Sequence, residues 1–366
     1  MSLNCKYLEV CRGCPLGGME YEQQKNHKKK MFLDRLENHL SPAARKNTQY
    51  EFVFPVFDHY RTRSDFIFQN GQLGWYTAER QFLAIEECTL QTRELNEFAQ
   101  MVGKLDWPIQ KGSMRFRVAP DGKRGLWLDL ANVDIKTILS APTLLPSLID
   151  QGIVIEMGQK GKQVIQEDQI KFVDPIPYPW FATEYENKSV PLKTLISSFT
   201  QTNPILNVHM IQLVKKYLHP LRFDQIIEFG SGTGNFTLFL TELSREVLAI
   251  ENDRRNLLPL RQNLADLSLS HHVKIIETVQ LFLSQEIHEA ATRLYFVNPA
   301  RSGVGSLFDR DVMATDVIYI SCHLDSFIRD AEKLDTQGFQ LVQATLFDQF
   351  PHSAHFEIVS FFKKAT

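Results

Sequence analysis

The chain has 366 residues, of which 43% are hydrophobic and 23% are charged, a composition typical of folded domains and not of a disordered chain. Its formal net charge of −3 and pI of about 6.4 exclude the strongly basic composition that is typical of nucleic-acid-binding domains. The sequence has neither an apolar run of about 18 residues nor an apolar N-terminal signal core, so we expect a cytoplasmic protein with no membrane partner.

Cysteines are concentrated at the N-terminus. Cys5, Cys11 and Cys14 are spaced C-x5-C-x2-C, and Cys88 follows about a domain's width later. In a reducing compartment, clustered cysteines are typical of metal sites or catalytic sites rather than of disulfides. We expect these four residues to hold a 4Fe–4S cluster or a zinc ion, and their spacing alone is compatible with both.

The next segments predict a helix and then a β-rich region. Apolar residues recur at helical spacing up to residue 40, beside a basic patch at 28–30, which indicates an amphipathic helix. Short strand-like runs follow, separated by glycine and proline, at residues 50–54, 65–68, 115–118 and 152–156. A proline-rich run at 175–179 marks the end of this region.

This pattern divides the chain into four parts. We expect a Cys-rich cluster-binding segment (1–18), an amphipathic helix (19–46), a β-rich central domain that contributes Cys88 (47–182) and a C-terminal domain (183–366).

The C-terminal part alternates strand-like and helical runs, which is typical of an open, mostly parallel α/β sheet. The strand-like runs lie at residues 226–229, 247–251, 273–277, 294–298, 317–321, 339–344 and 356–362. The link between the last two is too short for a crossover helix, so we expect them to pair antiparallel. Six parallel strands and one reversed strand resemble the class I (Rossmann-like) fold of S-adenosylmethionine-dependent methyltransferases.

A glycine-rich loop follows the first of these strands and contains Gly230, Gly232 and Asn235. Glycines allow the backbone to turn sharply and to approach a ligand closely. The second strand ends at Glu251, where a carboxylate can bind both ribose hydroxyls of a nucleoside cofactor. NAD and S-adenosylmethionine both satisfy this pattern, and the reversed seventh strand favours S-adenosylmethionine.

Two reactive side chains are expected to meet in the same cleft. Cys322 ends the fifth strand and Glu357 begins the reversed strand, which lies beside the fifth in the class I order. A thiolate that adds to carbon-6 of a pyrimidine makes carbon-5 nucleophilic enough to take a methyl group, and a base must then remove the carbon-5 proton. The pair therefore predicts pyrimidine carbon-5 methylation, and the alternative is an inert buried thiol beside an exposed strand residue.

Longer motifs resemble the RNA uridine-5-methyltransferase family, at residues 198–204, 297–303, 320–322 and 346–357. The resemblance implies that Cys322 is the nucleophile and Glu357 the proton acceptor. It also implies that S-adenosylmethionine is contacted by Gln201, Gly230, Asn235, Glu251 and Asn298. The cysteine pattern is similar to the 4Fe–4S site of the ribosomal RNA branch, and Asn298 is similar to the branch that methylates 23S ribosomal RNA.

The chain departs from the family pattern at several positions. Ala300 replaces the second of two prolines, His323 replaces the Asn of a Cys-Asn-Pro motif, and Gly230 and Thr200 replace aromatic residues. Cytosine-5 RNA methyltransferases need a second cysteine at the position of Ala300, so the resemblance implies uridine.

A uracil in folded RNA must be flipped out to reach such a cleft. Arg61 and Arg63 match a basic stretch of the family's central domain, and Phe350 and His352 lie in the motif that ends at Glu357. The resemblance therefore implies an RNA-binding central domain (47–182), and we expect these four residues to contact RNA. Lys28–Lys30, Arg115 and Arg117 are further candidates. The alternative for each basic residue taken alone is a solvated surface charge, and the alternative for His352 is a structural role.

The leading hypothesis is S-adenosylmethionine-dependent 5-methylation of a uridine in 23S ribosomal RNA by a monomeric enzyme. Three alternatives stay open: a tRNA substrate, a non-catalytic RNA-binding member of the fold, and a methyltransferase that acts on a small molecule.

Overall fold

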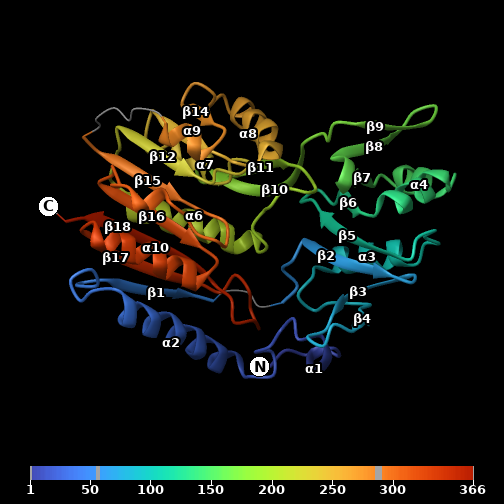
Figure 1. Ribbon diagram of the computed structural model, residues 1–366, viewed down its shortest axis with the longest axis horizontal. Helices are drawn as coiled ribbons and strands as arrows, with labels where there is room; N and C mark the ends of the chain where they lie inside the picture. The colour runs from blue at the N-terminus through green and yellow to red at the C-terminus, as the bar shows by residue number, and fades with distance from the viewer. Residues whose placement is uncertain (1, 55–57, 285–290, 366) are drawn as a thin grey trace.

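The computed structural model describes residues 2–54, 58–284 and 291–365. Two eight-stranded sheets and a two-stranded ribbon make up its β structure. Figure 1 shows the sheet of the C-terminal region on the left, the sheet of the central region on the right and the N-terminal segment below them. Within the described ranges, no helix is long and apolar enough to cross a lipid bilayer.

The C-terminal sheet has the order β1-β17-β18-β16-β15-β12-β13-β14. Its seven predicted strands are β12 (Gln225–Phe229), β13 (Val247–Ile250), β14 (Val273–Ile276), β15 (Arg293–Val297), β16 (Asp316–Ser321), β17 (Phe339–Phe347) and β18 (Glu357–Lys364). β18 pairs antiparallel with both of its neighbours, and the other pairings are parallel. The predicted α/β sheet with one reversed strand is therefore confirmed, including the position of the reversed strand beside β16.

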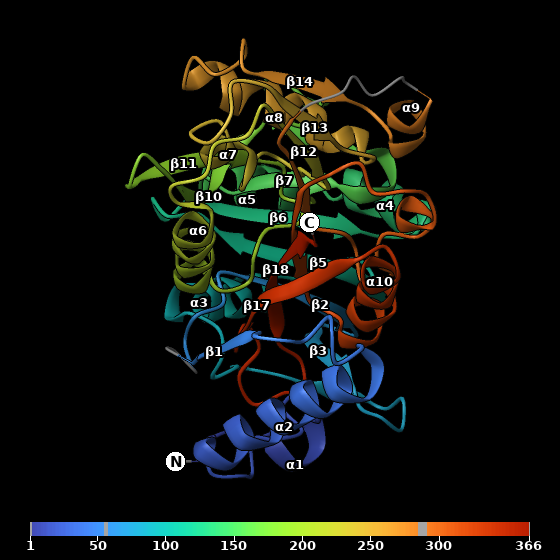
Figure 2. The same ribbon diagram turned by 90° about the vertical axis from the view of Figure 1, so that its left-hand side faces the viewer.

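Helices cover both faces of this sheet, which explains why its central strands are continuous apolar runs. Every residue of β12, β15 and β16 is buried. The covering helices are α6 (Pro204–Leu218), α7 (Thr237–Leu240), α8 (Arg254–Asp266), α9 (Val279–Leu283) and α10 (Leu324–Thr336). Figure 2 shows α6 and α10 on opposite sides of β17 and β18, and a separate apolar cluster fills each side.

The N-terminal helix and the first strand belong to this same sheet. The predicted amphipathic helix is α2 (Tyr21–His39), which packs Phe32 and Leu36 into the core on the α10 side. β1 (Gln49–Val53) pairs in parallel with β17. We had expected this strand in the central region, and the structure differs because its aromatic side chains pack on the apolar cluster beneath β17.

The central region forms a mixed sheet of order β4-β3-β2-β5-β6-β7-β8-β9. Its strands are β2 (Arg63–Gln69), β3 (Gln72–Tyr76), β4 (Phe82–Ala84), β5 (Lys111–Val118), β6 (Arg124–Asp129), β7 (Val154–Met157), β8 (Lys162–Gln166) and β9 (Ile170–Val173). The three other strands predicted here are thus confirmed as β2, β5 and β7. Only β6 and β7 pair in parallel, and the two helices between them provide the crossover that such a pair needs.

Shorter elements complete the two regions. They are α1 (Leu8–Cys11), α3 (Arg93–Gly103), α4 (Asn132–Ser140), α5 (Leu144–Asp150), the 3-10 turns η1 (Gly158–Lys160) and η2 (Leu307–Asp309), and the ribbon β10 (Tyr178–Tyr185) and β11 (Lys188–Thr194). The ribbon follows the central sheet in the chain and packs on α6, α7 and α8. The four-part division of the chain stays a prediction, with β1 now placed in the C-terminal sheet.

Candidate active site

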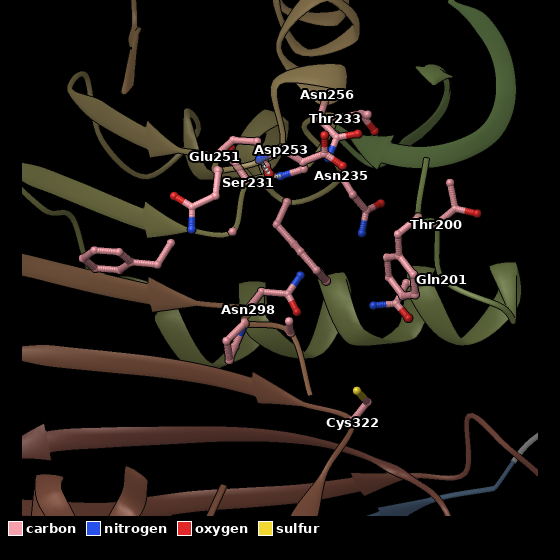
Figure 3. A pocket seen from close by; sticks show the side chains of 18 of the residues that line it. Thr200, Gln201, Ser231, Thr233, Asn235, Glu251, Asp253, Asn256, Asn298 and Cys322 are labelled. Atoms are coloured by element: carbon pink, nitrogen blue, oxygen red, sulfur yellow. Dashed lines mark hydrogen bonds between the residues drawn. The ribbon is translucent and has the colours of Figure 1, made fainter. Parts of the chain in front are cut away.

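A cavity of about 720 Å³ opens at the carboxyl ends of the parallel strands. All eight residues predicted as catalytic or cofactor-binding line it, namely Gln201, Gly230, Gly232, Asn235, Glu251, Asn298, Cys322 and Glu357. Figure 3 shows Glu251 and Ser231 on one side of this space, Cys322 on the opposite side, and Asn298 between them. The arrangement follows from topology, because the carboxyl ends of parallel strands share one edge of a sheet.

The glycine loop is shaped by a close backbone approach. Gly230 has a φ of +80°, and a Cβ atom added there would lie 2.3 Å from the carbonyl oxygen of Asn298. Gly232 also has a positive φ, of +58°, but an added Cβ would meet no atom within 4 Å. Gly230 therefore packs closely against the backbone of Asn298, directly after β15. Gly232 faces open space in which a ligand can approach the chain.

The carboxylate of Glu251 is fixed by backbone donors. The amides of Gly232 and Asp253 each donate to it, at 2.6 Å in both cases. Burial raises the pKa of Glu251, against the opposing effect of these two amides. The side chain is thus held at the cavity wall, where it can accept hydrogen bonds from ligand hydroxyl groups.

Amide pairs fix two further predicted residues. Asn235 exchanges two hydrogen bonds with Asn207, of 2.7 Å and 3.0 Å. Gln201 accepts a hydrogen bond of 3.1 Å from Gln349. These pairs orient side chains that would otherwise rotate freely at the cavity wall.

The cavity wall beside Gln201 is anchored from the central sheet. Arg117, on β5, is only 1% exposed and donates to the carbonyls of Leu195 and Ser198 and to the hydroxyls of Thr194 and Thr200. Arg117 was a further candidate for RNA contact, and its burial argues against both that role and a solvated surface charge, because its guanidinium makes these hydrogen bonds inside the protein.

Cys322 and Glu357 lie at the ends of neighbouring antiparallel strands. Ser321 of β16 is paired with Ile358 of β18, so the next residue of one strand and the preceding residue of the other lie at the same edge. Glu357 is 3% exposed, and burial raises its pKa to about 8. Burial also raises the pKa of the Cys322 thiol, and the charge of Glu357 adds to this effect.

Arg301 is a residue of this site to which the sequence had given no role. Its guanidinium lowers the pKa of both Cys322 and Glu357, opposing their burial. It follows Pro299 and Ala300 in the motif after the fourth strand, so the motif itself was the available signal. A cation at this place favours the thiolate and the carboxylate that the predicted chemistry needs.

Two of the four predicted RNA-contacting residues line the cavity, Arg63 and Phe350. The guanidinium of Arg63 lies 5.3 Å from the ring centre of Phe199, whose side chain is 66% exposed. An exposed aromatic ring with an arginine over it is a suitable surface for stacking a base. Phe199 was not singled out in the sequence, although it lies within the motif at 198–204.

The other two candidates lie elsewhere. Arg61 lies over the ring of Tyr60. Burial raises the pKa of Cys14 and Cys88, and the charge of Arg61 opposes this rise. His352 is 1% exposed, and its Nδ1 atom is hydrogen-bonded to Nε2 of Gln24, on α2, at 3.2 Å. Their contact with RNA stays a prediction.

Lys28 is also buried, with no exposed side-chain surface, and forms an ion pair with Asp348 at 2.5 Å. Lys28 was a further candidate for RNA contact, and its burial argues against both that role and a solvated surface charge.

The four predicted cluster ligands gather at one place. Cys5, Cys14 and Cys88 pack against a small apolar cluster formed by Leu3, Tyr60 and Leu90. Burial raises the pKa of Cys14 to about 12, and the charges of the other three cysteines add to this effect. Across the described residues, however, no three His, Cys, Asp or Glu side chains are close enough together to share one metal ion.

Comparison with known proteins gives a consistent result. Residues 182–365 match the model of the tRNA (uracil-5-)-methyltransferase family. An uncharacterized RNA methyltransferase of Bdellovibrio bacteriovorus is 33% identical, over 98% of this chain and 95% of the relative. The 23S rRNA (uracil(1939)-C(5))-methyltransferase RlmD of Vibrio parahaemolyticus is 23% identical, over 99% of this chain and 82% of its own length.

A solved structure is similar over almost the whole chain. The tRNA (uracil-54, C5)-methyltransferase of Pyrococcus abyssi, in complex with S-adenosyl-L-homocysteine, superposes with a TM-score of 0.67 at 17% identity. The match covers 96% of this chain and 85% of the other. At this level of identity, the comparison shows that the two proteins share a fold.

Proposed function

Because this chain belongs to the tRNA (uracil-5-)-methyltransferase family, we propose that it methylates carbon-5 of a uridine in 23S ribosomal RNA, with S-adenosylmethionine as methyl donor. The observation that carries the proposal is the single cavity that holds Cys322, Glu357 and the glycine loop together. Support for ribosomal RNA comes from the RlmD relatives, which align with nearly all of this chain. A tRNA substrate is the alternative, favoured by the name of the family model and by the archaeal structure.

The residues of the cavity fit S-adenosylmethionine. Glu251 would accept hydrogen bonds from the ribose hydroxyls, and the open space beside Gly232 allows the cofactor to approach the backbone. Gln201, Asn235 and Asn298 would supply further polar contacts along the same wall. When bound, this cofactor supplies an electrophilic methyl group.

Cys322 and Glu357 divide the reaction on the base between them. The thiolate of Cys322 adds to carbon-6 of the uracil, which moves electron density to carbon-5 and makes it a nucleophile. Once carbon-5 carries the methyl group, the carboxylate of Glu357 removes the proton that remains on it. The electrons of that C–H bond form the carbon-5 to carbon-6 double bond, and the bond between carbon-6 and sulfur breaks.

The test of this proposal is transfer of labelled methyl from S-adenosylmethionine to unmodified 23S ribosomal RNA and to tRNA in parallel, with nucleoside analysis of the product. We expect 5-methyluridine in the ribosomal RNA and none with a Cys322→Ala variant. Label in tRNA alone would keep the reaction and change the substrate. Absence of label in both RNAs, with S-adenosylmethionine bound, would contradict the proposal.

We also propose that Cys5, Cys11, Cys14 and Cys88 hold a 4Fe–4S cluster, with zinc as the alternative metal. Cys5, Cys14 and Cys88 pack on one small apolar cluster, and the charge of Cys11 acts on Cys14, which supports this proposal. Iron, sulfide and zinc contents of anaerobically purified protein distinguish the two metals. A Cys88→Ser variant that keeps the full metal content would contradict the ligand assignment.

A further inference from the structure

The loop between β17 and β18 brings Phe350 to the cavity and leads directly into Glu357. It has no regular secondary structure, yet Asp348 and Gln349 are fully buried, and His352 adopts a positive φ of 65°. A buried irregular segment needs partners for its backbone polar groups, and a strained residue persists only where its surroundings hold it. The elements that hold this loop therefore fix the chain that leads into Glu357.

One face of α2 supplies those partners. Tyr21, Gln24 and Lys28 are spaced so that they lie on the same side of the helix. Tyr21 donates a hydrogen bond of 2.8 Å to Asp348, and Gln24 meets the imidazole of His352 at 3.2 Å. Figure 2 shows the loop after β17, in red, extending toward α2.

Lys28 makes the densest set of these contacts. Its ammonium group donates to Asp348 at 2.5 Å, to the carbonyl of Phe350 at 3.0 Å and to the carbonyl of His355 at 3.1 Å. Three donors thus meet three acceptors, distributed from the start of the loop to two residues before Glu357. The Cys-rich segment adds a fourth contact, in which the amide of Leu16 donates to the carbonyl of His352 at 2.9 Å.

The need for a lysine at this position is not explained by stability. Two charges removed from water are expensive to bury, and an apolar pair of similar volume is often as stable or more stable. A lysine with three fixed acceptors does something that an apolar side chain cannot, which is to fix the path of the backbone between Asp348 and His355.

We propose that Lys28 is a positioning residue for the removal of the carbon-5 proton, acting through the loop that carries Phe350 and leads into Glu357. The inference rests on the proposed function, because it assigns Lys28 to one step of that reaction. Without Lys28, nucleophilic addition by Cys322 continues, since Cys322 directly follows β16 and is not part of this loop. Proton removal slows, because Glu357 directly follows the loop and Lys28 no longer fixes the carbonyl of His355, two residues before it.

The experiment compares three proteins with intact cysteines. Lys28→Met alone leaves Asp348 buried and unpaired, so the main variant combines Lys28→Met with Asp348→Asn, which removes both charges. Lys30→Met is the matched control, because Lys30 lies on the same helix with a side chain that is 76% exposed and pairs only with Asp34. Circular dichroism, the melting temperature and S-adenosylmethionine binding are measured first for each protein.

The deciding measurement is the ratio of covalent protein–RNA adduct to released 5-methyluridine RNA during one turnover. We expect the double variant to bind S-adenosylmethionine as the wild type does and to accumulate adduct, with release slowed by about 10–100-fold, the usual scale for a misplaced catalytic group. The Lys30→Met protein should match the wild type.

Three outcomes overturn the inference while the wild type stays active: release at the wild-type rate, a slower turnover with no adduct, or a loss of rate that follows the melting temperature alone. Each would mean that Lys28 only stabilises the fold. A wild type that methylates no RNA would instead contradict the proposed function.

Discussion

The pH dependence of product release is the most direct consequence of a buried catalytic base. Burial raises the pKa of Glu357 to about 8, and the nearby Arg301 guanidinium opposes this shift only in part. Only the ionised carboxyl can take the carbon-5 proton. With this pKa, about a tenth of the Glu357 groups are ionised at pH 7 and about nine tenths at pH 9, so we expect adduct breakdown to become about tenfold faster over this range.

The assay follows one turnover with labelled RNA, quenched in detergent, so that covalent and released RNA can be separated. The breakdown rate is measured from about pH 6.5 to about pH 9, a range that brackets the expected pKa. Formation of the adduct also accelerates with pH, because the pKa of the Cys322 thiol is raised by burial. That step precedes the measured decay and can be fitted separately.

The control is another buried carboxyl. Burial also raises the pKa of Glu228 to about 8. Glu228 lies just before the glycine loop, accepts a hydrogen bond from the hydroxyl of Thr237 and does not line the cavity. Glu228→Gln should leave the pH profile of breakdown unchanged, whereas Glu357→Gln should leave a persistent adduct. A breakdown rate that is flat or falls from pH 7 to pH 9 would refute the reasoning, and so would a Glu357→Gln adduct that decays like the wild type.

The same pKa shift predicts how stability changes with pH. A carboxyl whose pKa is higher in the folded than in the unfolded state contributes fully below its unfolded value, and this contribution is lost as pH rises through the folded value. The melting temperature of the wild type should therefore fall as pH rises through about 8, the folded-state value for Glu357. Glu357→Gln should show a smaller fall, provided that it folds, and an equal fall would argue against the shifted pKa.

Three further predictions concern other parts of the site. Cys322→Ala should abolish methyl transfer and retain RNA binding in a gel-shift assay, and unchanged turnover would overturn the mechanism. Gly230→Ala should weaken S-adenosylmethionine binding measured by calorimetry, because its Cβ would lie 2.3 Å from the carbonyl of Asn298; Gly71→Ala, with a similar φ of +78° and open space around it, should affect stability alone. Arg117→Met should lower the free energy of unfolding in urea by about 3 kcal/mol, since it leaves buried acceptors without their charged donor, and a loss below about 0.5 kcal/mol would contradict the anchoring role.

Much of the C-terminal fold could be predicted because its information is local. Apolar runs of strand length alternate with helical runs, and the short link after β17 determines the reversed direction of β18. Once the strand order is known, Cys322 and Glu357 must lie at the same edge, which is how sequence reasoning reached the candidate site. Arg301 and Phe199 were inside recognised motifs, but their roles depend on which groups they approach in space.

Contacts between residues far apart in the sequence could not be predicted in this way. Lys28 is one of three consecutive lysines, and nothing local distinguishes it from its exposed neighbour Lys30. Its burial depends on Asp348, which lies 320 residues away in the sequence. The strand β1 could be recognised by its pattern, but the edge to which it adds is formed by β17, near the other end of the chain.

The parallel pairing of β1 with β17 has a consequence for how the protein is made. Gln49 leaves the ribosome long before its partner Gln343 is synthesised. The strand β1 therefore has no sheet to pair with until nearly all of the chain has been translated. A chain that stops before residue 339 has no place for the aromatic side chains of β1. Conversely, residues 182–365 produced alone would present β17 as a bare sheet edge, open to pairing with other chains. We therefore expect the fragment to aggregate more readily than a chain that contains both β1 and β17.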